Sequence, residues 1–329
     1  MSEPRMRNLT MTAALHTALR EEMQADESVV LFGEDIAVYG GVYGVTIGLQ
    51  REFGPDRVRD TPISEMAIAG MALGASLGGQ RPVAEIMYCD FLAHAADAIV
   101  NNAAKWRYMS GGQYSLPMVI RSPAGGGGGT GAQHSQCLES WFTHIPGLKV
   151  VMPSVPRDAR GLLRAAIRDD NPVVFIEHKH HYGYKGDVPA EGEIIPLGVA
   201  DVKREGTDLT VVSWSRQLTV CLEAAEELAA EGIGLEVVDP RTLQPLDTAT
   251  ICASVAKTGR LAVVHEAVQF GGFGGEVVSQ VVERSWGDLK QAPLRIGAPF
   301  CPVPYSEPME SFVLPQKSLI VERVREYLK

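Results

Sequence analysis

The stretch RDTPISEMAIAGMALGASLGGQRPVAEIMYCDF (residues 59–91) predicts a helix followed by a buried strand. Pro62 disfavours helical structure before it, and Ser64 is a natural N-cap for a helix over residues 64–79. The run PVAEIMY (82–88) is short and apolar and follows a pair of glycines, which is typical of a buried strand. This stretch therefore has the order of elements that α/β proteins repeat.

The same alternation extends in both directions along the chain. Strands separated by helices form parallel sheets covered on both faces, so the sequence predicts an α/β fold. A segment rich in glycine, proline and charge (182–198) interrupts the alternation. We place a linker at 186–200, between a domain over residues 1–185 and a second domain over residues 201–329. The predicted strands are 29–33, 82–88, 117–122, 148–153, 172–177, 208–214, 235–240, 260–266 and 294–297, and the predicted helices are 10–25, 64–79, 91–109, 135–143, 156–168, 216–230, 247–257 and 274–285.

The composition of the 329 residues is that of a soluble globular protein, with 45% hydrophobic and 21% charged residues. The net charge of -10 disfavours binding to nucleic acid or to anionic membranes. No apolar run approaches the roughly 18 residues that span a bilayer, and the N-terminus lacks the apolar core of a secretory signal. The five cysteines are scattered and form no CxxC pair, which argues against a zinc ribbon or a disulfide framework. We expect a cytoplasmic enzyme.

Two familiar motifs match the sequence formally but fit their surroundings poorly. A G-x-G-x-x-G pattern begins at Gly126, yet a run of five glycines (125–129) matches almost any such template, and no tight turn leads from strand to helix. A G-x-S-x-G pattern surrounds Ser76, but this serine falls inside a predicted helix of small residues, where close packing is the better explanation. A P-loop is excluded, because no Gly-Lys-Ser/Thr occurs.

The histidines form two groups. His178, His180 and His181 end a predicted strand, and three histidines so close together cannot all converge on one ion. A solvated or subunit-facing strand end is therefore favoured over a metal site. His134 follows the glycine run and precedes the predicted helix 135–143. Glycine-rich loops at strand ends commonly border sites in α/β sheets, so a functional role is favoured over simple capping of that helix.

Glu65 is the only acidic residue between Asp60 and Glu85, and it opens an otherwise apolar helix. A carboxylate there could simply complement the helix dipole. If the helix is buried, however, the carboxyl needs a hydrogen-bonding partner or stays protonated. The helix dipole lowers the pKa of such a carboxyl and desolvation raises it. The net shift therefore depends on which group faces the carboxyl.

Eight segments together resemble one family, the beta subunit of the thiamine-diphosphate-dependent first component of 2-oxo acid dehydrogenase complexes. This family includes the pyruvate, branched-chain 2-oxo acid and acetoin dehydrogenases. The resemblance covers nearly the whole chain, and SEM and GAQHSQ in this order and spacing are specific to it. The segments are DTPISEM (60–66), EIMYCDF (85–91), NNAAKWRYMSGG (101–112), GAQHSQ (131–136), HIPGLKVVMPS (144–154), RDDNPVVFIEHK (168–179), VDPRTLQPLD (238–247) and HEAVQFGGFGGEV (265–277).

The resemblance implies a transketolase-like α/β architecture, with a pyrimidine-binding domain followed by a transketolase C-terminal domain. It implies that Glu65 hydrogen-bonds the aminopyrimidine ring of thiamine diphosphate and favours the imino tautomer. That tautomer generates the ylid that attacks the substrate carbonyl, and the cofactor is the electron sink when carbon dioxide leaves. Phe91 is expected to pack against the pyrimidine ring. His134 is expected to donate a proton during acyl transfer to the lipoyl dithiolane or to orient the reacting intermediate.

The resemblance also implies a potassium site, which on this chain falls at Met118, Ala166, Ile167, Asp169 and Asn171. A plain turn from helix to strand is the alternative interpretation of that segment. The Gly-Asp-Gly motif that holds the cofactor's magnesium is absent from the sequence. We therefore expect an alpha subunit to hold the diphosphate and magnesium in a two-alpha, two-beta heterotetramer.

A lipoylated acyltransferase is expected to dock on the C-terminal domain. The substrate is a 2-oxo acid or, alternatively, acetoin, because both reactions share the ylid and acyl-transfer chemistry. A serine hydrolase using Ser76 and a non-catalytic scaffold are the rival classes. Labelling of Ser76 by a fluorophosphonate would favour the first, and undiminished activity of a Glu65→Gln chain would favour the second.

Overall fold

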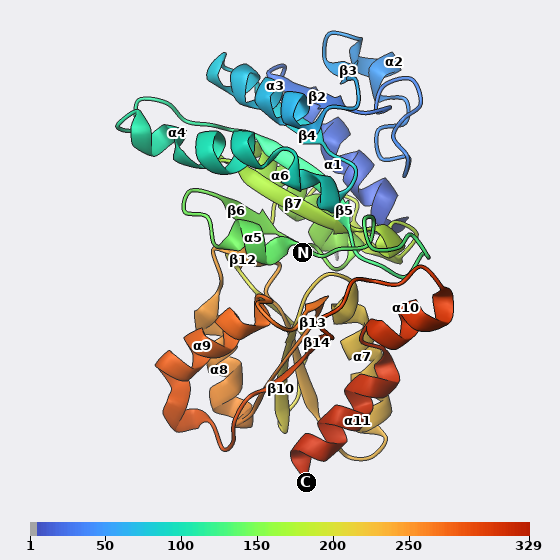
Figure 1. Cartoon of the computed structure of the whole chain (residues 1–329), viewed down its shortest axis with the longest axis vertical. Helices are drawn as coiled ribbons and strands as arrows, with labels where there is room; N and C mark the ends of the chain where they lie inside the picture. Colours follow the sequence, from blue (N-terminus) through green and yellow to red (C-terminus); the bar gives the residue numbers. More distant parts are fainter. Residues whose placement is uncertain (1–4) are drawn as a thin grey trace. The chain divides into compact units, whose positions relative to one another are not determined.

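The computed structural model describes residues 5–329, which form two compact units, each with its own sheet (Figure 1). The first unit contains the chain up to Ala124 together with Trp141–Leu197. The second unit contains Gly125–Ser140 together with Gly198–Lys329. The glycine run and His134 therefore belong to the second unit, although the segments on either side of them belong to the first. No helix within residues 5–329 is both long and apolar enough to cross a membrane.

The sheet of the first unit contains six parallel strands in the order β6-β7-β5-β4-β2-β3. Every residue of β2, β5 and β7 is buried, which explains why β2 and the first residues of β5 and β7 are apolar on both faces instead of alternating. The strands are β2 Val29–Gly33, β3 Val58–Asp60, β4 Arg81–Glu85, β5 Val119–Ala124, β6 Lys149–Val151 and β7 Val173–His178. The predicted parallel α/β arrangement is confirmed.

Helices α1 and α6 share one hydrophobic core with this sheet, which includes Leu15, Leu31, Leu162 and Phe175. Helix α1 begins after Thr10, whose hydroxyl accepts a hydrogen bond from the N–H of Ala13 at 3.1 Å. The α-helices that begin in this part of the chain are α1 Met11–Ala25, α2 Leu49–Phe53, α3 Glu65–Leu77, α4 Ala104–Met109, α5 Glu139–Thr143 and α6 Pro156–Arg168, and a short 3₁₀ turn, η3, covers Lys179–His181.

Two predicted helices differ from the structure. The predicted helix 91–109 is composite: a 3₁₀ turn (η1, Cys89–Ala93), a π-helical segment (η2, Asp97–Ala103) and then α4. Asn102 Nδ2 donates to the carbonyl oxygen of Asp97 at 3.0 Å, so side chains compete there with the regular helical ladder. The predicted helix 135–143 is shortened to α5, because its first residues lie in the loop that follows the glycine run.

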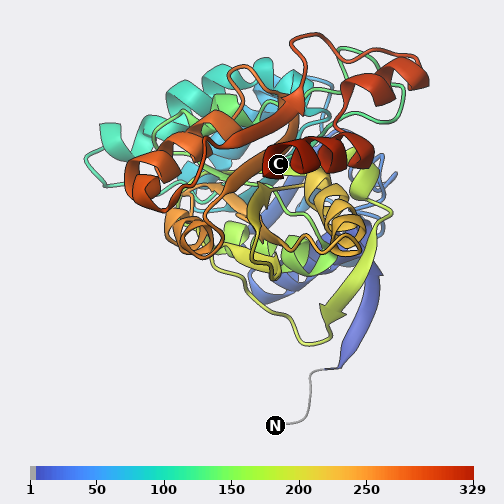
Figure 2. The ribbon, with the colours of Figure 1, turned by 90° about the horizontal axis from the view of Figure 1, so that it is seen from below.

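A two-stranded antiparallel ribbon completes the first unit (Figure 2). Strand β1 (Met6–Thr10) pairs with β8 (Lys185–Pro189), and the two strands lie side by side as the blue and yellow-green arrows of Figure 2. Strand β8 lies in the segment interpreted from composition as a linker. The domain limits 1–185 and 201–329 stay a prediction.

The second unit is built on a five-stranded sheet in the order β14-β13-β10-β11-β9, parallel except for β9. Figure 1 shows α8 and α9 on one side of this sheet and α7 and α11 on the other. Its strands are β9 Asp201–Arg204, β10 Leu209–Ser213, β11 Leu235–Asp239, β13 Leu261–Val268 and β14 Leu294–Ala298. The same unit contains a short strand outside this sheet, β12 Thr242–Gln244. Its helices are α7 Arg216–Ala229, α8 Thr248–Thr258, α9 Gly274–Ser285, the 3₁₀ turn η4 Trp286–Asp288, α10 Glu307–Val313 and α11 Lys317–Leu328.

Candidate functional site

Glu65 is the first residue of α3 and is buried, with its side chain 10% exposed. Its Oε2 lies 3.4 Å from Nδ1 of His94, which follows η1. The ring of His94 in turn lies 5.9 Å, between centroids, from that of Phe91, which is half-buried. The structure therefore brings the predicted residues Glu65 and Phe91 together through an imidazole that the sequence analysis missed.

A second buried carboxyl, close enough to interact electrostatically with Glu65, lies at the end of strand β2. Glu34 directly follows β2, and its Oε1 is buried without a hydrogen-bond partner among the described residues. Burial, and then the charges of Glu65, Asp35 and Glu85, raise the pKa of Glu34. A carboxyl directly after a buried parallel strand lies at the edge where α/β sheets bind ligands, and this signal could have identified Glu34. No local pattern in the sequence singles out His94.

The strand ends beneath this region are held by a buried ion-pair network. Nη1 of Arg121, on β5, lies 2.6 Å from Oε2 of Glu85 on β4. Its Nε and Nη2 both donate at 2.7 Å to the carboxylate of Glu177 on β7. The hydroxyl of Tyr182 donates to the same carboxylate at 2.6 Å. Burial raises the pKa of Glu85 despite the neighbouring Arg121 charge. The network joins the three neighbouring strands β4, β5 and β7. Its two carboxylates provide the partners that a buried arginine requires.

His134 lies in the second unit, in a turn that ends five residues before α5 begins. Its backbone N–H donates to the carbonyl oxygen of Gly131 at 3.3 Å, and its carbonyl oxygen accepts from the Thr130 hydroxyl at 3.0 Å. The side chain is half-buried. His134 therefore does not occupy the capping position of a helix, which was the alternative to a functional role.

The residues of the predicted potassium site lie together in the first unit, where α6 ends and β5 and β7 begin. Oδ1 of Asp169 accepts from the backbone N–H and from Nδ2 of Asn171, both at 2.9 Å. The N–H of Asp169 donates to the carbonyl oxygen of Ala166 at 3.3 Å, and the carbonyl oxygen of Met118 accepts from Val173 at 2.9 Å. The structure thus gathers these five residues: Met118, Ala166, Ile167, Asp169 and Asn171.

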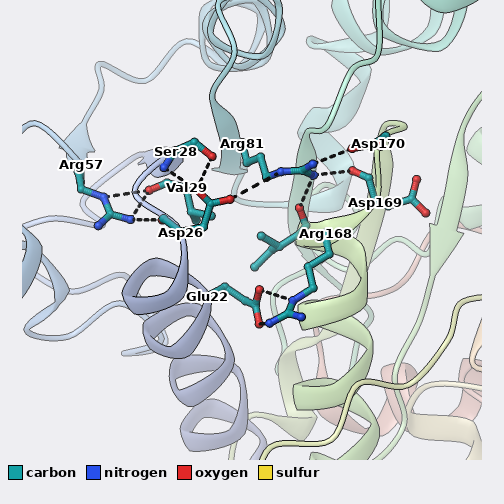
Figure 3. Close-up of polar contacts among 10 residues, drawn as sticks. Glu22, Asp26, Ser28, Val29, Arg57, Arg81, Arg168, Asp169 and Asp170 are labelled. Carbon is teal, nitrogen blue, oxygen red and sulfur yellow. Dashed lines mark hydrogen bonds and ion pairs between the residues drawn. The ribbon is translucent and has the colours of Figure 1, made fainter.

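Two cationic side chains already contact this cluster, and Figure 3 shows one of them, Arg81. Nη1 of Arg81 donates to the carbonyl oxygens of Ile167 and Asp169 at 3.1 and 3.2 Å, and Lys149 pairs with the Asp169 carboxylate. Burial would raise the pKa of Asp169, but hydrogen bonds from Lys149 and Asn171 lower it. A carbonyl oxygen has two lone pairs, so an alkali ion would share these oxygens with Arg81, whose positive charge opposes its binding. The potassium site stays a prediction.

The other candidate motifs have structural explanations. Ser76 lies buried in the last turns of α3 and not on a strand-to-helix elbow. Gly126 is followed by a loop and not directly by a helix, so the dinucleotide pattern lacks its structural context. The backbone N–H of His180 donates to Nδ1 of His178 at 3.1 Å within a tight turn. In residues 5–329, no three His, Cys, Asp or Glu side chains are arranged to hold a metal ion.

Comparison with known families identifies both units. Residues 7–185 match the family "Transketolase, pyrimidine binding domain", and residues 198–320 match "Transketolase, C-terminal domain". A solved structure described as a split-gene transketolase, an inactive beta4 tetramer, superposes with a TM-score of 0.78 over 97% of this chain and 98% of that one. Its sequence is 23% identical, so this likeness concerns the fold. The predicted transketolase-like fold is confirmed.

Closer relatives match almost end to end. The pyruvate dehydrogenase E1 component subunit beta of Bacillus subtilis is 47% identical over 98% of this chain and 100% of the relative. The corresponding subunit of Rickettsia conorii is 46% identical over 97% and 98%. The beta subunit of acetoin:2,6-dichlorophenolindophenol oxidoreductase from Cupriavidus necator is 45% identical over 98% of each chain. Similarity of this extent covers both units and the segments that contain Glu65, Phe91 and His134.

Proposed function

This chain belongs to the family of beta subunits of the thiamine-diphosphate-dependent first component of 2-oxo acid dehydrogenase complexes, and from this premise we propose the roles of its residues. It is one subunit of an oxidoreductase of the pyruvate dehydrogenase type. In the proposed reaction, a 2-oxo acid, a lipoyl disulfide and one proton give carbon dioxide and an S-acyl dihydrolipoyl group. The bond between the carboxylate and the carbonyl carbon breaks, the acyl carbon is oxidised, and the disulfide is reduced. One sulfur takes the acyl group and the other takes the proton.

Thiamine diphosphate, when bound, supplies the electron sink for the decarboxylation. Glu65 and Phe91 are the residues of this chain proposed to hold its aminopyrimidine ring. The buried carboxyl of Glu65 suits a ring nitrogen, because in water-poor surroundings it needs a partner that shares a proton. The placement of the buried Glu65 carboxyl 3.4 Å from Nδ1 of His94 is the single observation that carries the proposal. Burial and, to a smaller extent, the charge of Glu65 raise the pKa of Glu34, which favours its neutral form.

His134 is proposed to hold the proton that the leaving sulfur takes during acyl transfer. Imidazole is suited to this role, because its ordinary pKa lies near neutrality. In the same proposal, potassium is held by the backbone carbonyls around Asp169 and Asn171 and steadies the start of β7. Neither role depends on the other, so each can be tested separately.

The remaining half of the cofactor site is proposed to come from an alpha subunit. The relatives are named as beta subunits of a component, which implies such a partner. We propose a two-alpha, two-beta heterotetramer in which the alpha subunit holds the diphosphate and magnesium. A lipoylated acyltransferase docks on the second unit and receives the acyl group. A cytoplasmic location stays a prediction.

Acetoin is the alternative substrate. The Cupriavidus necator relative named for acetoin is nearly as similar as those named for pyruvate, and acetoin cleavage uses the same acyl-transfer step. Comparing carbon dioxide release from pyruvate with acetaldehyde release from acetoin, in the complex with its alpha partner, separates the two. The larger number of relatives named for pyruvate dehydrogenase favours the 2-oxo acid.

The deciding experiment is Glu65→Gln in the chain co-expressed with its alpha subunit. Loss of the carboxyl removes the group that shares a proton with the cofactor ring, so kcat should fall by about 10² to 10⁴. The measurement is pyruvate-dependent reduction of 2,6-dichlorophenolindophenol. Glu191→Gln, which removes an exposed carboxyl from the same unit, should leave kcat unchanged. Full activity in Glu65→Gln, with the alpha subunit still copurifying, would refute the assignment.

A further inference from the structure

The glycine run before His134 has an alternating backbone. Gly125, Gly127, Gly129 and Gly131 have φ values of 88°, 98°, 63° and 74°, a region that other residues rarely adopt. Left-handed residues at alternate positions turn successive backbone N–H groups toward one side of the chain. The result is a concave run of donors, of the kind that binds anions in proteins. The backbone conformation thus requires glycine at these alternate positions of the run.

Two carboxylate side chains of the same chain accept hydrogen bonds from these N–H groups. The N–H groups of Gly127 and Gly129 donate to Oε1 and Oε2 of Glu310, on α10, at 2.7 and 2.9 Å. The N–H of Gly126 donates to Oε1 of Glu266, on β13, at 2.7 Å. Glu310 is 2% exposed and Glu266 is 8% exposed. Hydrogen bonds from backbone donors to a buried carboxylate are among the strong ones in proteins. We name Glu266 and Glu310 the carboxylate clamp.

Close packing reinforces the clamp. A Cβ atom at Gly126 would lie 3.0 Å from Cδ1 of Leu314 and 3.2 Å from Oε1 of Glu310. A Cβ atom at Gly129 would lie 3.3 Å from the carbonyl oxygen of Tyr305 and would require a strained backbone. The segment around α10 therefore lies directly against the glycine run. A loop that composition alone suggests to be flexible is tied to the body of the second unit.

We infer that Glu310 is a positioning residue for His134. The clamped Gly129 is joined directly to Thr130, whose hydroxyl donates to the carbonyl oxygen of His134 at 3.0 Å. The next turn closes with the His134 N–H donating to Gly131. Two hydrogen bonds, from Gly129 to Glu310 and from Thr130 to His134, thus connect the Glu310 carboxylate to the backbone of His134. The inference rests on the proposed role of His134 in acyl transfer.

Glu310→Gln in the assembled alpha–beta complex tests the inference with two measurements. A glutamine side chain has one acceptor oxygen in place of two and no charge. Amide hydrogen exchange in the peptide covering residues 125–131 should therefore become roughly tenfold to hundredfold faster. Acyl transfer from pyruvate to free lipoamide should fall roughly tenfold relative to reduction of 2,6-dichlorophenolindophenol, because only the former uses His134. Glu307→Gln, an exposed carboxyl on the same helix, is the matched control and should change neither measurement.

Glu310→Asp keeps the charge but is one methylene shorter, so its exchange rate and activity ratio should lie between those of the wild type and Glu310→Gln. It serves as the test if Glu310→Gln fails to assemble. Unchanged exchange in the glycine run would overturn the clamp. Faster exchange with an unchanged activity ratio would overturn the positioning role. His134→Ala separates the two proposals: an unchanged ratio in that variant refutes the proposed role of His134, whereas the exchange measurement still tests the clamp.

Discussion

At the scale of single residues, buried carboxyl groups of the second unit differ in what faces them. Glu310 receives two backbone N–H groups. Glu139 is 1% exposed, and its Oε2 has no hydrogen-bond partner among the described residues. Burial, with the nearby charge of Glu266, raises the pKa of Glu139 to about 7, although a hydrogen bond from Trp214 acts in the opposite direction. The same type of side chain therefore binds two backbone donors at one position and has a strongly raised pKa at another.

The raised pKa of Glu139 predicts how stability depends on pH. A carboxyl with a folded pKa above its unfolded value of 4.5 stabilises the fold below that pH, and this contribution is lost as the pH rises through about 7. Glu139→Gln removes the ionisation. Its unfolding midpoint relative to wild type should therefore increase by about 5 °C between about pH 5 and about pH 8. Differential scanning calorimetry at both pH values measures this, with the exposed Glu223→Gln on α7 as control. An equal difference at both pH values would contradict the assignment.

At the scale of elements, α1 and α6 are joined by charged groups at the margin of their shared core (Figure 3). Glu22, on α1, is 2% exposed, and its carboxylate accepts from Nε of Arg164 at 2.8 Å and from Nε of Arg168 at 2.7 Å. Both arginines lie on α6. One turn before Arg164 in the same helix, Arg160 pairs with Glu21. A buried carboxylate that two guanidinium groups share sets the register of the two helices.

Removing the shared carboxylate should cost more than removing one of its partners. Glu22→Ala leaves Arg164 without its buried partner, and should lower the free energy of unfolding by about 3 kcal/mol and the midpoint by roughly 6–10 °C. Arg168→Ala should cost less than about 1 kcal/mol, because the side chain of Arg168 is 46% exposed and solvent screens its charge. Thermal unfolding of both variants measures the contrast. Equal decreases in the unfolding midpoints of the two variants would show that the ion pair between Glu22 and Arg164 is not effectively buried.

At the scale of the whole molecule, the chain is expected to need another polypeptide. Among residues 5–329, no group of His, Cys, Asp or Glu side chains is arranged to hold a metal ion, and the relatives are named as one subunit of a component. Glu65 is proposed to bind only the aminopyrimidine half of the cofactor. In this proposal the alpha subunit supplies the site for the magnesium diphosphate.

The purified chain alone should therefore show no pyruvate-dependent reduction of 2,6-dichlorophenolindophenol, even with thiamine diphosphate and magnesium in excess. Addition of the alpha subunit should restore turnover by at least about 10³ over this background. Sedimentation of the mixture measures assembly in parallel, and a mass of two chains of each kind is expected. Turnover by the isolated chain at the rate of the complex would contradict the proposed division of the site.

Local sequence patterns predicted the helices and strands whose hydrophobic residues form a clear periodic pattern or a continuous run. The buried strand 29–33 and the helix 156–168 have the predicted bounds, because continuous apolar runs and a helical period depend on neighbouring residues. The composite structure of 91–109 was not predicted by these patterns, since the side chains of Asn101 and Asn102 donate hydrogen bonds to the side chain and the backbone of Asp97 where the regular helix is interrupted. The roles of Glu65, Phe91 and His134 stay predictions, although the structure places Glu65 and Phe91 within reach of the same imidazole.

The sequence by itself therefore determined the parallel α/β class, the transketolase-like family and the candidate carboxyl of Glu65, which are properties of local period and of motif order. The partners of the key groups were decided only by the tertiary structure. Glu310 lies 181 residues beyond Gly129, and β1 pairs with β8 across most of the first unit's length of chain. Contacts between such distant segments arise when apolar faces are buried together, and no window of sequence contains both partners.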